Sequence, residues 1–115
     1  MHDAFKQLSA LPASTLVYCG HEYTIPNLQY AAYVEPGNET IVQKLRWAEA
    51  KRRASQWTVP STIGQELKMS PFMRACCAAP TVMQHCRLAP EETVEAVGFV
   101  RQEKSAGAWK AKMGK

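Results

Sequence analysis

Apolar side chains recur along most of this chain at the three- and four-residue spacing of an amphipathic helix. The helix ends carry the expected signals, since Pro12 ends the first helix, Asn38 can cap the third, and Thr62 and Gln65 form a capping box. The pattern therefore predicts a mainly α fold, with helices at residues 2–11, 25–34, 39–54, 62–69 and 90–104.

One short stretch has the composition of a strand. Residues 14–19 are rich in β-branched and aromatic side chains and are followed by Gly20, which predicts a short buried strand. The pattern shows no second strand, so the backbone donors and acceptors of this one need another partner. We therefore expect that another protein chain can pair with its exposed edge.

Several expectations concern the rest of the chain. Residues 74–90 are the least regular, with Pro80 and Pro90 as breaks, and the Lys-rich residues after Gly107 read as a frayed tail. Trp57 and Val59 are expected to pack against the helices. One face of the last helix is expected to carry Val94, Val97, Gly98 and Arg101.

Composition and charge are those of an ordinary soluble protein of one domain. Of the 115 residues, 46% are hydrophobic and 21% are charged. The formal net charge of +4 suits an acidic small molecule, whereas the scattered Lys and Arg residues argue against nucleic acid. No segment reads as a signal peptide or a membrane span, and the four cysteines form no C-x-x-C pair. We therefore expect an intracellular protein, cytoplasmic or mitochondrial, with reduced thiols and no membrane contact.

Several segments, in the same order along the chain, resemble the hydroxyacylglutathione hydrolase (glyoxalase II) family of the metallo-β-lactamase superfamily. The resemblance spans residues 2–104 and covers only the C-terminal part of such an enzyme. The segments that carry it are Val17–Thr24, Asn27-Leu28, Val34–Pro36, Thr58–Glu66, Pro71–Arg74 and Val100–Lys104.

The resemblance implies a particular division of the chain. Residues 1–24 would be a helix and a strand left from the αββα sandwich of that superfamily, ending in the segment that contains His21. Residues 25–104 would be the helical C-terminal domain that binds the substrate, and residues 105–115 a basic tail. The expected fold is therefore mainly α with one or two residual strands, as if the chain began at an internal methionine.

The resemblance also implies a chemistry. The family hydrolyses S-(2-hydroxyacyl)glutathione thioesters at two metal ions, which are zinc, or alternatively iron or manganese. Of the family's ligands only His21 is matched, and the His-x-His-x-Asp-His motif is absent from this chain, whose other histidines are His2 and His85. A catalytic zinc ion takes three protein ligands. We therefore expect that this chain alone neither retains metal nor hydrolyses a thioester, and we assign it no catalytic residue.

The substrate-binding residues of the family are better matched. By resemblance, Tyr23 contacts glutathione, and Arg101 and Lys104 bind its glycine carboxylate. The i, i+3 spacing of the two cations places both on one face of a helix, where they can hold one carboxylate. From spacing alone, two solvated cations near a helix C-terminus are the favoured interpretation, and it is the resemblance that favours carboxylate binding.

Two other functions remain open. The chain could be a non-catalytic structural or binding subunit of a larger assembly, derived from glyoxalase II and paired through its strand edge. It could also be a separate glutathione-binding module that uses Tyr23, Arg101 and Lys104. His21, kept beside the substrate residues, favours the hydrolase interpretation.

Four side chains outside these motifs carry metal-binding or redox chemistry. A zinc site of Cys76, Cys77, His85 and Cys86 is chemically conceivable, although its spacing fits no standard zinc motif, and the adjacent thiols Cys76 and Cys77 could be redox-active. We interpret Arg74 as structural, joining the helical domain to the sandwich, and Phe72 and Trp109 as packing residues.

Overall fold

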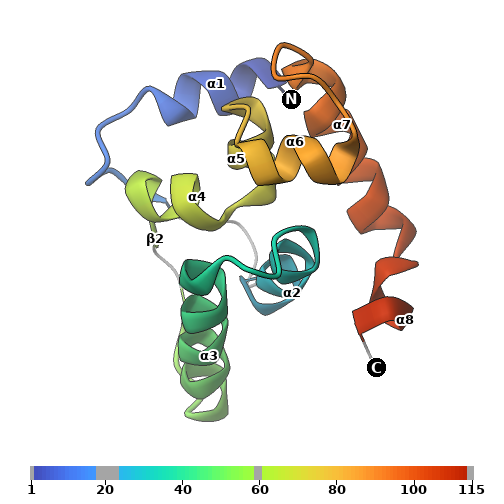
Figure 1. The fold of residues 1–115 in the computed structure, drawn as a ribbon. Helices are drawn as coiled ribbons and strands as arrows, with labels where there is room; N and C mark the ends of the chain where they lie inside the picture. Colours follow the sequence, from blue (N-terminus) through green and yellow to red (C-terminus); the bar gives the residue numbers. More distant parts are fainter. Residues whose placement is uncertain (1, 18–23, 59–60, 114–115) are drawn as a thin grey trace.

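Helices dominate the residues that the computed structural model describes, which are 2–17, 24–58 and 61–113 (Figure 1). Within these ranges the elements are α1 (His2–Ser9), β1 (Leu16–Val17), α2 (Thr24–Val34), α3 (Glu39–Arg53), β2 (Ser61–Thr62), α4 (Ile63–Met69), α5 (Pro71–Cys76), α6 (Pro80–Cys86), α7 (Thr93–Ala106) and α8 (Trp109–Met113). The prediction of a mainly α fold with one or two short strands is confirmed.

The predicted strand has a partner within the chain. β1 pairs antiparallel with β2, in a register that sets Leu16 opposite Thr62 and Val17 opposite Ser61. The pairing continues beyond the strands, because the Ile63 amide donates to the Thr15 carbonyl at 2.9 Å. The expectation of a strand without a partner was therefore wrong. β2 escaped detection because it is two residues long and runs directly into α4.

The first turns of α3 and α4 have the caps that the sequence predicts. The side-chain oxygen of Asn38 accepts hydrogen bonds from the amides of Thr40 and Ile41, at 3.1 and 3.4 Å. Thr62 and Gln65 form the reciprocal capping box at the start of α4. A side-chain cap of this kind stabilises a helix by about 1 kcal/mol. Figure 1 shows α3 extending away from the other helices, held mainly by α2 and α4.

Prolines begin two helices that the sequence pattern did not predict. Pro71 opens α5 and Pro80 opens α6, where the missing proline amide costs nothing because the first amides of a helix have no internal partner. The expectation that residues 74–90 are irregular was wrong for this reason. Pro90 was expected to open a helix, but it lies in the turn before α7, where Glu92 Oε1 accepts from the Ala89 amide at 2.9 Å.

The larger hydrophobic core lies between α2, α5, α6, α7 and α8. On α7, Val97 is buried, whereas Val94 is 60% exposed and Gly98 and Arg101 are at the surface. The buried residues of this core are Tyr30, Val34, Ala75, Val82, Met83, Cys86, Ala96, Val97, Val100 and Trp109. A smaller core joins α2, α3 and α4 through Leu28, Ala31, Ile41, Ala48 and Met69.

The segment after α7 is ordered helix rather than a frayed tail. Gly107 ends α7 in the left-handed conformation, with φ of 76°, and α8 follows at once. Trp109 at the start of α8 is 4% exposed, whereas Trp57, which was expected to pack inward, is 67% exposed. Val59 lies outside the described residues. In the ranges that the structure describes, every helix is too short or too polar to cross a membrane.

Candidate functional site

The two ends of the predicted substrate site differ in what the structure describes. His21 and Tyr23 lie outside the described residues, so their roles as metal ligand and glutathione contact stay predictions. Helix α2 begins at Thr24, directly after that segment in the chain. The first turn of α2 therefore follows the predicted His21 segment directly in the sequence.

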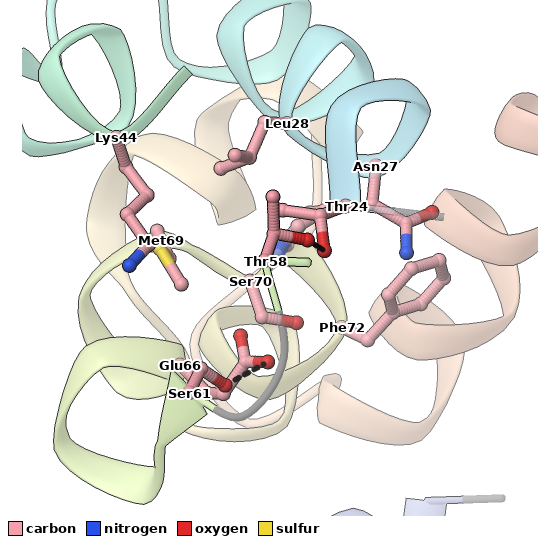
Figure 2. Close-up of a pocket in the computed structure, with 11 residues that line it drawn as sticks. Thr24, Asn27, Leu28, Lys44, Thr58, Ser61, Glu66, Met69, Ser70 and Phe72 are labelled. Carbon is pink, nitrogen blue, oxygen red and sulfur yellow. Dashed lines mark hydrogen bonds between the residues drawn. The ribbon is translucent and has the colours of Figure 1, made fainter. Parts of the chain in front are cut away.

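A small cavity lies at this first turn, between α2, α3, α4, α5 and β2 (Figure 2). Its volume is about 80 Å³, room for a few water molecules but too small for a peptide such as glutathione. Most of its lining comes from the segments on which the resemblance to glyoxalase II rests. The lining residues are Thr24, Asn27, Leu28, Lys44, Thr58, Ser61, Glu66, Met69, Ser70, Pro71 and Phe72.

Hydroxyl groups tie the walls of this cavity together. Thr58 Oγ1 donates to Thr24 Oγ1 at 2.6 Å, and Ser61 Oγ donates to Glu66 Oε1 at 3.0 Å, as Figure 2 shows. The first bond holds the start of α2 to the segment after α3, and the second holds β2 to α4. The Thr58 hydrogen bond therefore fixes the position of the first residue of α2.

The charged side chains at the cavity have shifted pKa values. Burial raises the pKa of Glu66, and the Ser61 hydrogen bond and the Lys44 charge oppose that shift. Burial lowers the pKa of Lys44, which the charge of Glu66 in turn opposes. One acid and one base, both partly buried, thus line this cavity.

Arg101 and Lys104 lie on α7, away from this cavity. α7 is helical through both residues, so the predicted i, i+3 arrangement on one face holds. Arg101 is exposed and Lys104 is half-buried, and the Lys104 carbonyl accepts a hydrogen bond from Trp109 Nε1 at 3.2 Å. Neither side chain lines the cavity. α5, which brings Phe72 to the cavity wall, packs against α7.

Sequence reasoning missed a polar cluster between α2, α6 and α7. Glu103 Oε1 accepts a hydrogen bond from the Tyr30 hydroxyl at 2.9 Å and lies 2.6 Å from His85 Nε2. Burial and the adjacent Glu103 carboxylate raise the pKa of the Tyr30 phenol far above its ordinary value. The partners are 73 and 18 residues apart in the chain, so no local spacing could indicate the cluster.

Arg74 is structural, as predicted, but its described partners lie within the helical region and not in a sandwich. Its guanidinium contacts both carboxylate oxygens of Glu35, at 2.6 and 2.8 Å, and donates to the Leu67 carbonyl at 3.2 Å. Glu35 is 3% exposed and also accepts from Thr81 Oγ1 at 2.6 Å. The ion pair joins α5 and α6 to the end of α2.

The conceivable zinc site of Cys76, Cys77, His85 and Cys86 is not formed. Among the described side chains, no three His, Cys, Asp or Glu residues gather as metal ligands would. His85 is hydrogen-bonded to Glu103, and Cys86 is buried in the core. Burial and the neighbouring Cys77 raise the pKa of the Cys76 thiol, whereas an activated thiol needs a lowered pKa. This argues against a redox role for Cys76, which is a free thiol.

Comparisons with known proteins give one family. Residues 22–106 match the family described as "Hydroxyacylglutathione hydrolase C-terminus". The chain is 57% identical over 67 residues to "Hydroxyacylglutathione hydrolase cytoplasmic" of Arabidopsis thaliana, covering 58% of this chain and 26% of the relative. It is 36% identical over 104 residues to "Hydroxyacylglutathione hydrolase" of Mesorhizobium japonicum, covering 90% of this chain and 40% of the relative.

A third relative is also named as a hydroxyacylglutathione hydrolase, with the qualifier "Probable". The chain is 41% identical over 97 residues to "Probable hydroxyacylglutathione hydrolase" of Schistosoma mansoni, covering 84% of this chain and 39% of the relative. In these three comparisons the chain therefore spans between 26% and 40% of the relative's length.

Proposed function

This chain belongs to the hydroxyacylglutathione hydrolase C-terminus family, and from this premise we propose that it forms the glutathione-binding part of a hydroxyacylglutathione hydrolase. The substrates would be S-(2-hydroxyacyl)glutathione thioesters. The observation that carries the proposal is the family match over residues 22–106, which includes every helix from α2 to α7. The proposed division is a sandwich remnant up to residue 24 and a helical domain from residue 25. The helical domain would include α8, because Trp109 on α8 is buried in the larger core.

Arg101 and Lys104 would bind the glycine carboxylate of glutathione. A carboxylate between two cations forms charge-assisted hydrogen bonds, each worth about 1.5–3 kcal/mol. The exposed position of Arg101 on α7 supports this role, because its guanidinium is open to an incoming ligand. Tyr23 would add a hydroxyl contact from the segment before α2.

The metal chemistry of the family would need residues beyond this chain. His21 would supply one ligand, and the described part of the chain offers no group of three donors that fits a metal centre. In the family, metal ions make hydroxide available near neutral pH. We therefore propose that this chain contributes binding and one ligand, and that it hydrolyses no thioester by itself.

A second function is favoured by one surface. Leu8, Leu11 and Leu16, on α1 and β1 or between them, are 44%, 43% and 56% exposed. Exposed apolar residues beside a strand edge are typical of a surface that another chain covers. This surface would suit a binding or structural subunit of a larger assembly, and it would equally suit contact with the sandwich of a hydrolase.

Reconstitution tests the proposal. The chain is mixed with the separate N-terminal region of the Mesorhizobium japonicum relative, and hydrolysis of S-lactoylglutathione is measured. Neither part should react alone, and the mixture should. His21→Ala should abolish the activity. Arg101→Ala with Lys104→Ala should raise KM by about a hundredfold, since each of the two lost contacts is worth about a factor of ten.

Arg46→Ala, at an exposed position on α3, is the control and should leave KM unchanged. Hydrolysis by this chain alone with two tightly bound metal ions would contradict the proposal. Activity of the mixture that survives His21→Ala would contradict it as well. Recovery of the chain with an unrelated subunit and no hydrolase activity would favour the second function.

A further inference from the structure

The carboxylate of Glu103 is the point where three helices meet. Its Oε1 atom receives the Tyr30 hydroxyl of α2 at 2.9 Å and lies 2.6 Å from Nε2 of His85 on α6. A carboxylate only accepts hydrogen bonds, so His85 carries its proton on Nε2. Tyr30 is fully buried, and His85 and Glu103 have side chains only 19% and 24% exposed. The bonds are therefore partly shielded from water, which strengthens them.

Aromatic rings enclose the same cluster. The His85 ring meets the Tyr33 and Phe99 rings edge to face, with centroids 5.4 and 6.0 Å apart. The Tyr30 ring meets the Trp109 ring at 5.3 Å in the same manner. Each ring fixes the rotamer of a hydrogen-bonding partner of Glu103. Tyr30 and His85 are thus held in place by packing, and they in turn hold the Glu103 carboxylate in one position.

We infer that Glu103 is a positioning residue for Arg101 and Lys104, an inference that rests on the proposed function. Successive residues of an α-helix are about 100° apart, so Arg101 points to the side of α7 nearly opposite Glu103. Anchoring Glu103 inward to α2 and α6 therefore sets the rotation of α7 and directs Arg101 outward. Lys104 lies about 100° from Glu103, at the border between buried and exposed surface, as its half-buried side chain shows.

The charge of Glu103 makes the inference separable from simple electrostatics. A carboxylate on the same helix as two cations weakens their attraction for an anionic ligand, so its removal should by charge alone strengthen glutathione binding. If Glu103 positions the cations, its removal should weaken binding instead. The two effects have opposite signs.

The experiment measures binding of glutathione and of its glycine ethyl ester to the full 115-residue chain by NMR titration. The ester lacks the carboxylate that Arg101 and Lys104 would hold. The ratio of the ester Kd to the glutathione Kd therefore reports on that contact alone. A merely structural loss would weaken both ligands alike and leave the ratio unchanged. Glu103→Ala should reduce the ratio about tenfold, the value of one charge-assisted contact.

Tyr30→Phe keeps the carboxylate charge and removes one hydrogen bond, so it should reduce the ratio by a smaller factor. Glu95→Ala is the matched control, since Glu95 is an exposed carboxylate on the same helix, and it should preserve the ratio. Circular dichroism at the titration temperature establishes that each variant is folded. If Glu103→Ala does not fold, Tyr30→Phe decides.

An unchanged or increased ratio in Glu103→Ala, with the ratio lost in Arg101→Ala, would overturn the positioning role and leave the proposed function intact. A ratio that survives Arg101→Ala together with Lys104→Ala would overturn the proposed function itself. The two failures are therefore distinguishable in one set of titrations.

Discussion

The guanidinium of Arg74 and the carboxylate of Glu35 form a two-point ion pair, with N–O distances of 2.6 and 2.8 Å. Glu35 follows α2 and Arg74 lies on α5, so the pair joins two of the segments that carry the family resemblance. Thr81 adds a third hydrogen bond to the same carboxylate, from α6. A carboxylate this deeply buried is tolerated because all its partners are present.

Breaking the pair from one side should be costly. Arg74→Met leaves the Glu35 carboxylate buried without its countercharge, and we expect a loss of about 3–5 kcal/mol in the free energy of unfolding. Urea denaturation measures it. The double variant Arg74→Met with Glu35→Gln should lose less than the sum of the single variants, because it leaves no unpaired charge. Arg46→Met, at an exposed position, is the control.

Trp109 should contribute far more to stability than Trp57, which lies in the segment after α3. Trp109 is 4% exposed and donates from Nε1 to the Lys104 carbonyl at 3.2 Å, whereas Trp57 is 67% exposed. Trp109→Ala should cost about 3–5 kcal/mol by opening a cavity beside Tyr30. Trp57→Ala should change stability by less than about 0.5 kcal/mol. Equal losses in the two variants would show that α8 does not pack as the structure places it.

The sequence pattern was sufficient for α2, α3 and α4, because apolar spacing and side-chain caps are local signals. It was insufficient for α5 and α6. A proline at the first position of a short helix looks, in sequence, the same as a proline that ends one, and helices of 6 and 7 residues are too short to show a period. α8 was missed because the burial of Trp109 depends on Tyr30, which lies far away in the chain.

The candidate site divides in the same way. Arg101 and Lys104 were indicated by the family resemblance, and the helix around them is as predicted. The cluster of Tyr30, His85 and Glu103 depends on the packing of three helices, so no local sequence pattern indicates it.

Stability should fall between pH 9 and about 11 partly because of Cys86. Burial and the nearby Glu103 raise the pKa of this thiol from 9.0 to about 11. Above pH 9 the unfolded chain loses the thiol proton while the folded chain keeps it, so the unfolded state binds fewer protons and stability decreases as pH rises. The contribution is complete below the unfolded pKa and is lost as pH passes through the folded pKa.

Urea denaturation of the native chain and of Cys86→Ala at several pH values measures this contribution. The difference in the free energy of unfolding between the two chains should shrink by about 2 kcal/mol from pH 9 to about 11, since each unit of pKa shift corresponds to 1.36 kcal/mol. The comparison cancels the titrating groups that do not interact with Cys86, such as Lys44. A difference that does not change with pH would show that the Cys86 thiol titrates alike in the folded and unfolded states.

The cavity at the start of α2 makes a prediction about Glu66. Burial raises the pKa of this carboxyl, while the Ser61 hydroxyl and the Lys44 charge lower it, so removing either one should raise the pKa further. NMR titration of the Glu66 side chain in Ser61→Ala and in Lys44→Met measures the change. Lys68→Met removes a charge from an exposed position of the same helix and should leave the pKa where it is. A Glu66 pKa that stays constant in Ser61→Ala would mean that the 3.0 Å hydrogen bond between these side chains does not persist in solution.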